Sequence, residues 1–294
     1  MRIFKEEKPQ YIVGRNNLAI TIFVPYDCPN HCPFCTSKSE YANTESFSID
    51  KIAAALKKVG YLRYVSDIVI TGGEPFADLV KLQYILDHCK HYHKNIYINT
   101  TLPVRNKEEA DNIFNFILKN QRIINGLNIS RHMCVKTNLE DDNLIKRIYE
   151  NTSLPIRINS VLIEVKAEQT RVKDFIDKYS SFVDKITFRG DYTKIKNQND
   201  LRGLDHPLLK VLFNLPNLTY ITSGGCLVCN DNSFFMHDTH KDTIISLHRG
   251  YEHSCVKQGR YYILNDIIIK QDGRILCDWD GEELDVDELK HQWR

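Results

Sequence analysis

Three cysteines stand close together near the start of the chain, at Cys28, Cys32 and Cys35. Thiolates are soft ligands that favour iron–sulfur clusters, zinc or Cu(I). A tetrahedral zinc site or an ordinary four-cysteine cluster needs a fourth ligand nearby, and the next cysteine is Cys89. The spacing therefore predicts a compact loop that supplies three metal ligands and leaves one metal position for another group.

The cysteine loop lies in a chain pattern typical of parallel α/β proteins. Residues 18–24, just before it, form a continuous β-prone run, as expected for a strand buried on both faces. Further strand-like runs alternate with helical patterns, at residues 67–71, 94–100, 126–130, 155–163 and 185–189. Because the helices act as crossovers between strands, this alternation predicts one parallel sheet with right-handed connections.

A second short motif ends the second predicted strand, where Gly72, Gly73, Glu74 and Pro75 follow one another. An aromatic residue, Phe34, also stands just before the third cysteine. In this order, the cysteine spacing, the aromatic residue and the Gly-Gly-Glu-Pro segment resemble the radical S-adenosylmethionine (SAM) superfamily, over about residues 16–190. The alternative is a chance cysteine triplet, or a zinc knuckle with a distant ligand.

The resemblance implies a fold. Six βα units would form an α/β architecture, a partial (βα)6 TIM-like barrel, with the active site at the C-terminal ends of its strands. We expect a lead-in at residues 1–17, the partial barrel at 18–190, and a small cysteine-containing C-terminal extension at 191–294.

The resemblance also implies a chemistry. In the superfamily, three cysteines bind three irons of a 4Fe-4S cluster, and the methionine moiety of SAM chelates the fourth iron. The Gly-Gly-Glu-Pro segment holds the methionine amino group. One electron from the cluster cleaves SAM, and the resulting 5′-deoxyadenosyl radical takes a hydrogen atom from the substrate. Cys28, Cys32 and Cys35 are thus expected to be catalytic, in an oxidoreductase, lyase or isomerase.

Strand parity suggests further SAM contacts, because alternate residues of a strand face the same side. Asn99 and Thr101, at the third strand, resemble the polar ribose-contacting segment of the superfamily. Ser130, on the fourth strand, matches a position that often contacts SAM, and Asn159 lies on the fifth. For each of these residues the alternative is an ordinary barrel-lining role.

Three arginines also fall on predicted strands, at Arg131, Arg157 and Arg189. Two that converge would bind a phosphate or carboxylate bidentately. The alternative is a surface ion pair, which is favoured for Arg131 because it lies on the opposite parity to Ser130. Residues 157–163 resemble the corresponding strand of the molybdenum-cofactor cyclases, which rearrange GTP.

A second cysteine set lies in the C-terminal region, at Cys226, Cys229, Cys255 and Cys277. A C-x₂-C pair followed by two more cysteines is a common metal signature for zinc or iron–sulfur. The turn at residues 271–273 before Cys277 resembles the hairpin of the auxiliary-cluster (SPASM/twitch-like) domains. We expect one further 4Fe-4S cluster here, with zinc or free thiols as the alternatives.

Composition limits the partners. The net charge of +1 offers no electrostatic case for nucleic acid. No apolar run reaches the roughly 18–20 residues that a membrane span needs, and the N-terminus lacks the apolar core of a signal peptide. Nine cysteines without an export signal predict a cytoplasmic protein whose cysteines serve as ligands or thiols.

Three functions are then open. The first is a radical SAM enzyme that acts on a small molecule, with a nucleotide or another phosphorylated compound as the favoured class. The second is a peptide- or protein-modifying radical SAM enzyme, such as a ribosomal peptide maturase. The 27 residues before Cys28 are too few for the N-terminal peptide-recognition domain of many such relatives. The third, a non-catalytic iron–sulfur or zinc module, is least favoured. Either enzyme would need an electron donor such as flavodoxin or ferredoxin.

Overall fold

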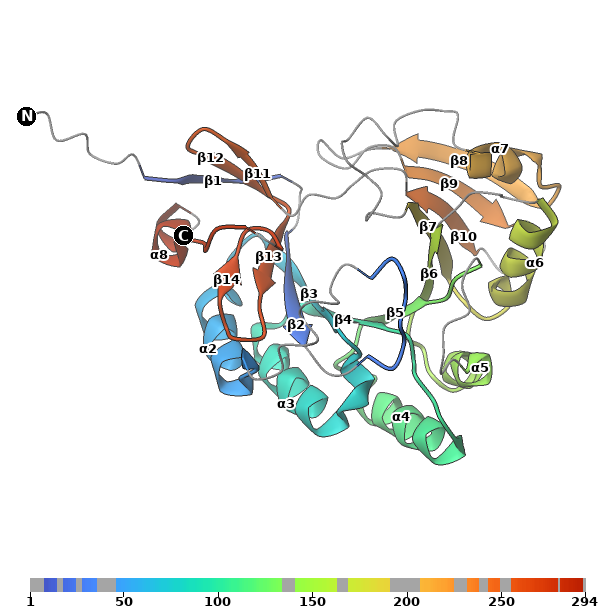
Figure 1. Ribbon diagram of the computed structural model, residues 1–294, viewed down its shortest axis with the longest axis horizontal. Coiled ribbons are helices and arrows are strands. Elements are labelled where there is room, and N and C mark those ends of the chain that lie inside the picture. Colours follow the sequence, from blue (N-terminus) through green and yellow to red (C-terminus); the bar gives the residue numbers. More distant parts are fainter. Residues whose placement is uncertain are drawn as a thin grey trace, which may run out of the picture.

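The computed structural model describes residues 8–14, 18–24, 28–35, 46–133, 141–162, 169–190, 207–224, 232–237, 243–248, 255–279 and 281–292. Their strands form an 11-stranded sheet and a 3-stranded sheet. Helices cover the outer side of the large sheet, and its strands curve around the opposite side (Figure 1).

The centre of the large sheet is six adjacent parallel strands. They are β2 (Leu18–Val24), β3 (Val65–Gly72), β4 (Asn95–Thr100), β5 (Gly126–Ser130), β6 (Ile156–Leu162) and β7 (Lys185–Gly190). They confirm the predicted series of βα units and the partial TIM-like barrel. The described strands do not close into a ring, because β14 and β8 form two free edges.

Strands from the C-terminal region extend both sides of this centre. β10 (Ile244–His248) pairs in parallel with β7, and β13 (Asp266–Ile269) pairs in parallel with β2. Beyond them lie antiparallel neighbours, β9 (Asn232–His237), β8 (Leu218–Gly224) and β14 (Ile275–Leu276). The sequence predicts short strands after residue 190 but not these pairings. Residues before and after the predicted domain boundary at residue 190 therefore contribute strands to the same sheet.

The small sheet joins the two ends of the described chain. It consists of β1 (Gln10–Val13), β12 (Tyr261–Leu264) and β11 (Cys255–Gln258). The last helix, α8 (Val286–Gln292), lies beside it, and its Gln292 side chain accepts a hydrogen bond of 2.8 Å from the backbone N–H of Tyr11. Figure 1 shows this sheet above β2 and β13, apart from β8, β9 and β10.

The crossover helices are α2 (Ile49–Val59), α3 (Leu79–Cys89), α4 (Lys107–Asn120), α5 (Asp142–Asn151) and α6 (Gln169–Ser180), and α7 (Pro207–Asn214) follows them. A short 3₁₀ helix, η2 (Pro75–Ala77), precedes α3, and another, η3 (Lys90–Tyr92), follows it. Ser48, Asp78, Asn106 and Asp141 cap four of the helices, because each side chain accepts a backbone N–H of the first turn. Within the described residues, no helix is long and apolar enough to cross a membrane.

The two faces of the central strands differ in polarity. The residues that pack against the helices belong to one apolar core, and on β2 to β4 they include Ile20, Ile22, Ile68, Ile70, Ile96 and Ile98. The alternate positions face inward and are largely polar, as at Thr71, Asn99 and Asn128. Because hydrophobic burial is satisfied on the helical side, the inner face is available for polar ligands.

Gly72 provides a test of this arrangement, because it has a φ of 135° and a Cβ there would lie 2.0 Å from the Val24 carbonyl oxygen. Gly72→Ala should lower the free energy of unfolding by about 2–4 kcal/mol in urea denaturation. Gly259→Ala is the matched control, since Gly259 also has a positive φ, 63°, but has nothing within 4 Å of its Cβ position. Its cost should stay near 1 kcal/mol. Equal losses in the two variants would contradict a tight junction of β2 and β3.

Candidate active site

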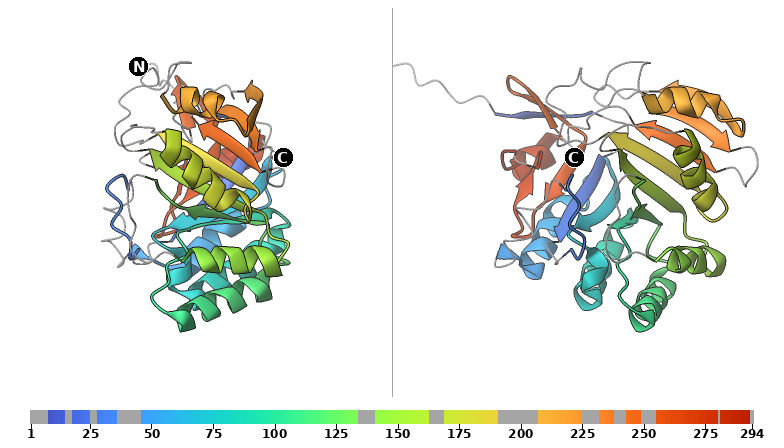
Figure 2. Two further views of the ribbon diagram at one scale, coloured as in Figure 1. Left: turned by 90° about the vertical axis from the view of Figure 1, so that its right-hand side faces the viewer. Right: turned by 45° about the vertical axis from the view of Figure 1, so that its right-hand side comes forward.

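The cysteine loop follows β2 at the edge where the neighbouring parallel strands also end. Cys28, Cys32 and Cys35 are all half-buried. The backbone N–H of Cys35 donates to the Cys32 carbonyl at 3.1 Å, and the backbone N–H of Asn30 donates to the Cys28 sulfur. In the side view of Figure 2 the loop, in dark blue, lies at one end of the central strands. The three predicted ligands thus share one short, tightly turned segment.

The residues of the loop fit an iron–sulfur cluster. Burial raises the pKa of the Cys28 thiol to about 11, so a metal ion must displace its proton on binding. The buried Asn30 amide has no hydrogen-bond partner at Nδ2 or Oδ1 among the described residues. Within the described part of the chain, no three Cys, His, Asp or Glu side chains already form a metal-binding group. The loop therefore supplies three thiol donors beside a buried amide that lacks a partner among the described residues.

The Gly-Gly-Glu-Pro segment joins the ends of β2 and β3 beside this loop. The backbone N–H of Gly73 donates to the Val24 carbonyl at 2.8 Å, and the positive φ of Gly72 lets the two strands approach closely. Glu74 then caps η2 and is completely buried. The segment lies at the same strand edge as the cysteines, as predicted from its place in the sequence.

The Glu74 carboxylate accepts hydrogen bonds from four donors. Oε1 accepts from the hydroxyl of Thr100 at 2.5 Å and the backbone N–H of Phe76 at 3.1 Å. Oε2 accepts from the backbone N–H and the hydroxyl of Thr101, at 2.7 and 2.8 Å. Burial raises the pKa of Glu74, and these hydrogen bonds oppose that rise. Both carboxylate oxygens of Glu74 are therefore hydrogen-bonded within the protein. The SAM contact predicted for the Gly-Gly-Glu-Pro segment is then left to its backbone groups.

Three of the polar residues predicted to bind SAM face the inner side together. Asn99 donates to the Thr71 hydroxyl at 3.3 Å and accepts from Asn128 at 2.8 Å. Ser130 on β5 is the register partner of Asn159 on β6. The Oδ1 atom of Asn159 is buried and has no partner among the described residues. This row therefore contains the type of acceptor that a polar ligand satisfies.

Residues 22–130 match the model of the Radical SAM superfamily. This chain carries a radical SAM domain. The match spans β2 to β5 and includes the cysteine loop, the Gly-Gly-Glu-Pro segment and Ser130.

The fold of nearly the whole chain is similar to that of solved structures. One is Streptococcus suis SuiB, at 18% identity and a TM-score of 0.56, and another is the same protein bound to S-adenosylmethionine, at 17% and 0.57. Both comparisons cover 95% of this chain but only 66% of the other, so the chain spans about two thirds of the length of SuiB. No curated protein is similar enough to match the chain.

Arg131 lies on the outer side of the radical SAM domain. Its side chain is 1% exposed, and its Nε atom forms an ion pair of 3.0 Å with Asp142 at the start of α5. Its Nη1 atom donates to the carbonyls of Thr101, at 2.7 Å, and Ser130, at 2.8 Å. Arg131 therefore joins the ends of β4 and β5 to a helix. The predicted ion pair is present, but the predicted surface position is wrong, because the side chain is buried.

The other two arginines lie on the inner face, together with a lysine that the sequence analysis did not single out. Arg157 and Lys185 are register partners on β6 and β7, and Arg189 lies four residues further along β7 on the same face. Burial, followed by the charges of Arg157 and Arg189, lowers the pKa of Lys185 to about 8. Lys185 could have been predicted from the sequence to face inward, because it has the same strand parity as Arg189.

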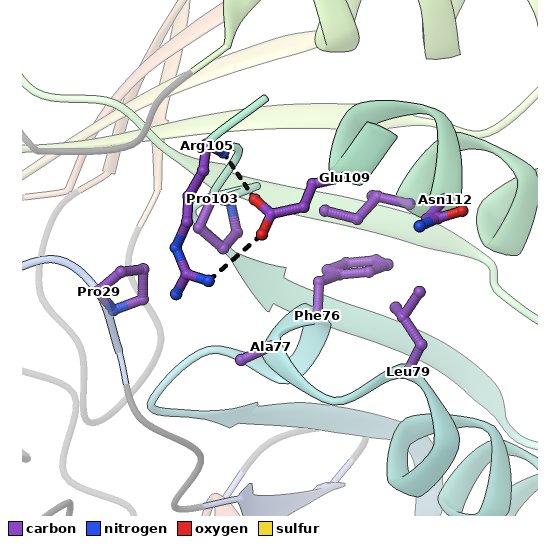
Figure 3. Close-up of a pocket in the computed structure, with 9 residues that line it drawn as sticks. Pro29, Phe76, Ala77, Leu79, Pro103, Arg105, Glu109 and Asn112 are labelled. Carbon is purple, nitrogen blue, oxygen red and sulfur yellow. Dashed lines mark hydrogen bonds and ion pairs between the residues drawn. The ribbon is translucent and has the colours of Figure 1, made fainter. Parts of the chain in front are cut away.

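One cavity lies between the cysteine loop and the starts of α3 and α4. It has a volume of about 200 Å³ and is lined by Pro29, Phe76, Ala77, Leu79, Pro103, Arg105, Glu109, Asn112 and Ile113. Figure 3 shows the Arg105 guanidinium, held to Glu109 at 3.3 Å, between Pro29 and the apolar wall. Because the walls come from η2, α3 and α4, this cavity is separate from the inner polar rows.

Only two of the four cysteines in the second set belong to the residues that the structure describes. Cys226 and Cys229 lie outside the described residues. Cys255, at the start of β11, and Cys277, just after β14, are both buried. Their thiols interact, which raises the pKa of Cys255 and lowers the pKa of Cys277. Residues 22 positions apart in the sequence thus meet as a pair of thiols.

The Glu74 network generates a prediction. In Glu74→Gln the new amide group must face a backbone N–H in either orientation, because each oxygen of Glu74 accepts one from Phe76 or Thr101. We expect the variant to lose about 1–3 kcal/mol of unfolding free energy in urea, since a buried donor is left unpaired.

Glu109→Gln is the matched control. Glu109 also accepts a backbone N–H, from Arg105 at 2.7 Å, but its other oxygen faces an exposed guanidinium. One amide orientation therefore satisfies the backbone, and the loss should stay below about 1 kcal/mol. A Glu74→Gln variant as stable as this control would show that the carboxylate does not hold the strand ends.

Proposed function

We propose that the protein is a radical SAM enzyme that cleaves S-adenosylmethionine reductively at a 4Fe-4S cluster bound by Cys28, Cys32 and Cys35. The observation that carries the proposal is the position of the cysteine loop. The charge of Glu74 acts on Cys28, and Phe34 contacts His132 just after β5, the strand that ends at Ser130. With the cluster and SAM bound, one electron cleaves SAM to methionine and a 5′-deoxyadenosyl radical, which takes a hydrogen atom from the substrate.

The chain itself would hold and orient these groups. The three thiolates bind the cluster, and backbone groups of the segment from Gly72 to Pro75 hold the amino group of SAM. Asn99, Ser130 and Asn159 offer amide and hydroxyl groups to its ribose and adenine, from three neighbouring strands. The electron donor is a small redox protein of the flavodoxin or ferredoxin class.

The substrate we propose is a small molecule with a phosphate or another anionic group, such as a nucleotide. Arg157, Lys185 and Arg189 bring three cationic side chains to the inner face of β6 and β7. The Nε atom of Arg189 is buried and has no partner in the described part of the chain. A guanidinium in this state is suited to bind an oxyanion. This cationic wall favours a small anionic substrate over peptide modification.

We further propose that Cys226, Cys229, Cys255 and Cys277 bind a second 4Fe-4S cluster, with zinc as the alternative. The contact between the Cys255 and Cys277 thiols supports this proposal. The interaction lowers the pKa of the Cys277 thiol, which favours a thiolate ligand there, whereas it raises the pKa of Cys255, so a metal ion must displace the Cys255 proton on binding.

The metal centres can be separated by analysis of iron and sulfide after anaerobic reconstitution. The wild type should bind about eight irons per chain and, with dithionite, convert SAM to 5′-deoxyadenosine. Cys28→Ala should retain about four irons and make no 5′-deoxyadenosine. Cys255→Ala should also retain about four but keep a cluster that cleaves SAM.

Cys89→Ala is the control, because Cys89 is completely buried at the end of α3 and lies in neither set. It should match the wild type in iron content and in SAM cleavage. Production of 5′-deoxyadenosine by Cys28→Ala would contradict the assignment of Cys28 as a ligand of the catalytic cluster. About four irons in the wild type, with zinc or no metal in the second set, would reject the second cluster.

The cationic wall predicts a pH dependence. Sulfate is a suitable probe because its charge does not change between pH 6 and 9. Lys185 has a pKa of about 8, so it is protonated below that pH and loses its charge above it. Sulfate affinity in calorimetry should therefore fall severalfold as the pH rises from 7 to 9. Lys185→Met should bind more weakly at pH 7 and show a flatter profile.

Lys58→Met is the control for this measurement, because Lys58 is exposed at the end of α2. It should keep both the affinity and the pH profile of the wild type. An unchanged profile in Lys185→Met would mean that another group controls anion binding.

A further inference from the structure

His132 connects two strand ends at the inner face. It follows β5 and has the same parity as Ser130 and Asn128. Its Nδ1 atom accepts a hydrogen bond of 3.1 Å from the backbone N–H of Val161 on β6. His132 and Val161 each lie two residues beyond Ser130 and Asn159, the last register pair of the two strands.

The same hydrogen bond assigns one tautomer to the imidazole. Burial, followed by the charge of Arg131, lowers the pKa of His132 to about 4, so the ring is neutral near pH 7. Because Nδ1 accepts from Val161, the proton of a neutral ring must be on Nε2. Rotation of the ring would leave a backbone N–H without its acceptor, which fixes the ring orientation.

The fixed ring meets the cysteine loop. The ring centroids of His132 and Phe34 are 4.6 Å apart, and their planes are inclined at 72°, an edge-to-face contact. Phe34 stands between Cys32 and Cys35, which are themselves joined by a backbone hydrogen bond of 3.1 Å. A displacement of Phe34 would therefore move both cysteines. On the other side, Gly73 fixes the strand end from which the loop departs.

We propose that His132 is a positioning residue for the cluster. The inference rests on the proposed function. The imidazole, held by Val161, anchors Phe34 and so sets the place of Cys32 and Cys35 relative to the ends of β5 and β6. Ser130 and Asn159 lie on those same two strands. One side chain thereby links the position of the iron ligands to that of the residues proposed to hold SAM.

Two readouts test the proposal without turnover. In metal-free protein labelled with ¹⁵N-histidine, His132 should show an unprotonated Nδ1 and a protonated Nε2 between pH 6 and 8. In reconstituted protein, the rate of iron loss to a chelator should rise about tenfold in His132→Ala, the ratio expected for loss of one anchoring contact. The KM for SAM should rise as well, because the ligands and the SAM-binding residues lose their fixed relation.

Two more variants separate the ring from the hydrogen bond, and they also serve if His132→Ala fails to fold. His132→Phe keeps a ring against Phe34 but gives Val161 no acceptor. His132→Asn keeps an acceptor but removes the ring. Both should lose iron at rates between those of the wild type and His132→Ala. His91→Ala, at an exposed histidine in η3, should match the wild type.

The results distinguish this proposal from the proposed function. Iron loss and KM at wild-type values in both His132→Phe and His132→Asn would overturn the positioning role, even if the enzyme is active. A wild type that binds the cluster but never cleaves SAM would refute the proposed function, while faster iron loss in the variants would still support the anchor. A protonated Nδ1 in the metal-free protein would also overturn the proposal.

Discussion

The buried Glu74 carboxylate is the interaction on which the site depends. It connects the end of β3 to Thr100 and Thr101 at the end of β4, and both of its oxygens accept a backbone N–H. The Thr100 hydroxyl in turn accepts from the N–H of Leu102, a buried leucine with a φ of 47°. A carboxylate removed from water is costly unless its oxygens are fully hydrogen-bonded, and here four donors meet that requirement. The polar cluster therefore defines one arrangement of these strand ends.

The rest of the site follows from the parallel order of the strands. When strands run the same way, their C-terminal ends meet at one edge, so the cysteine loop after β2 and the segment after β3 become neighbours. The apolar side of each strand packs against helices, which leaves the alternate side chains for the inner face. The same alternation separates the arginines. Arg131 faces α5 and its partner Asp142, whereas Arg157 and Arg189 face inward.

The sequence was sufficient for the features that depend on local pattern and parity. The six strands, the position of the cysteine loop and the separation of Arg131 from the inner face all follow from hydrophobic period and residue order. The pairing of β10 with β7 and of β13 with β2 does not, because these contacts join residues far apart in the chain and no local period records them. The contact of His132 with Phe34 was also missed, since it joins two loops. Lys185 could have been found by parity alone.

Charge is distributed unevenly over the inner face, and this distribution would influence the orientation of the proposed anionic substrate. The inward acids of the described strands are Asp67 on β3 and Asp266 on β13, each already hydrogen-bonded by a neighbouring side chain. Arg157, Lys185 and Arg189 lie across the sheet, on β6 and β7. An anionic group bound there would be near Asn159, because Asn159 pairs with Thr187 in the row between Lys185 and Arg189. Since Asn159 also neighbours Ser130, the anion and SAM would share one wall. The uncharged part of the substrate would then extend across the sheet toward the cysteine loop, where the proposed hydrogen abstraction would occur.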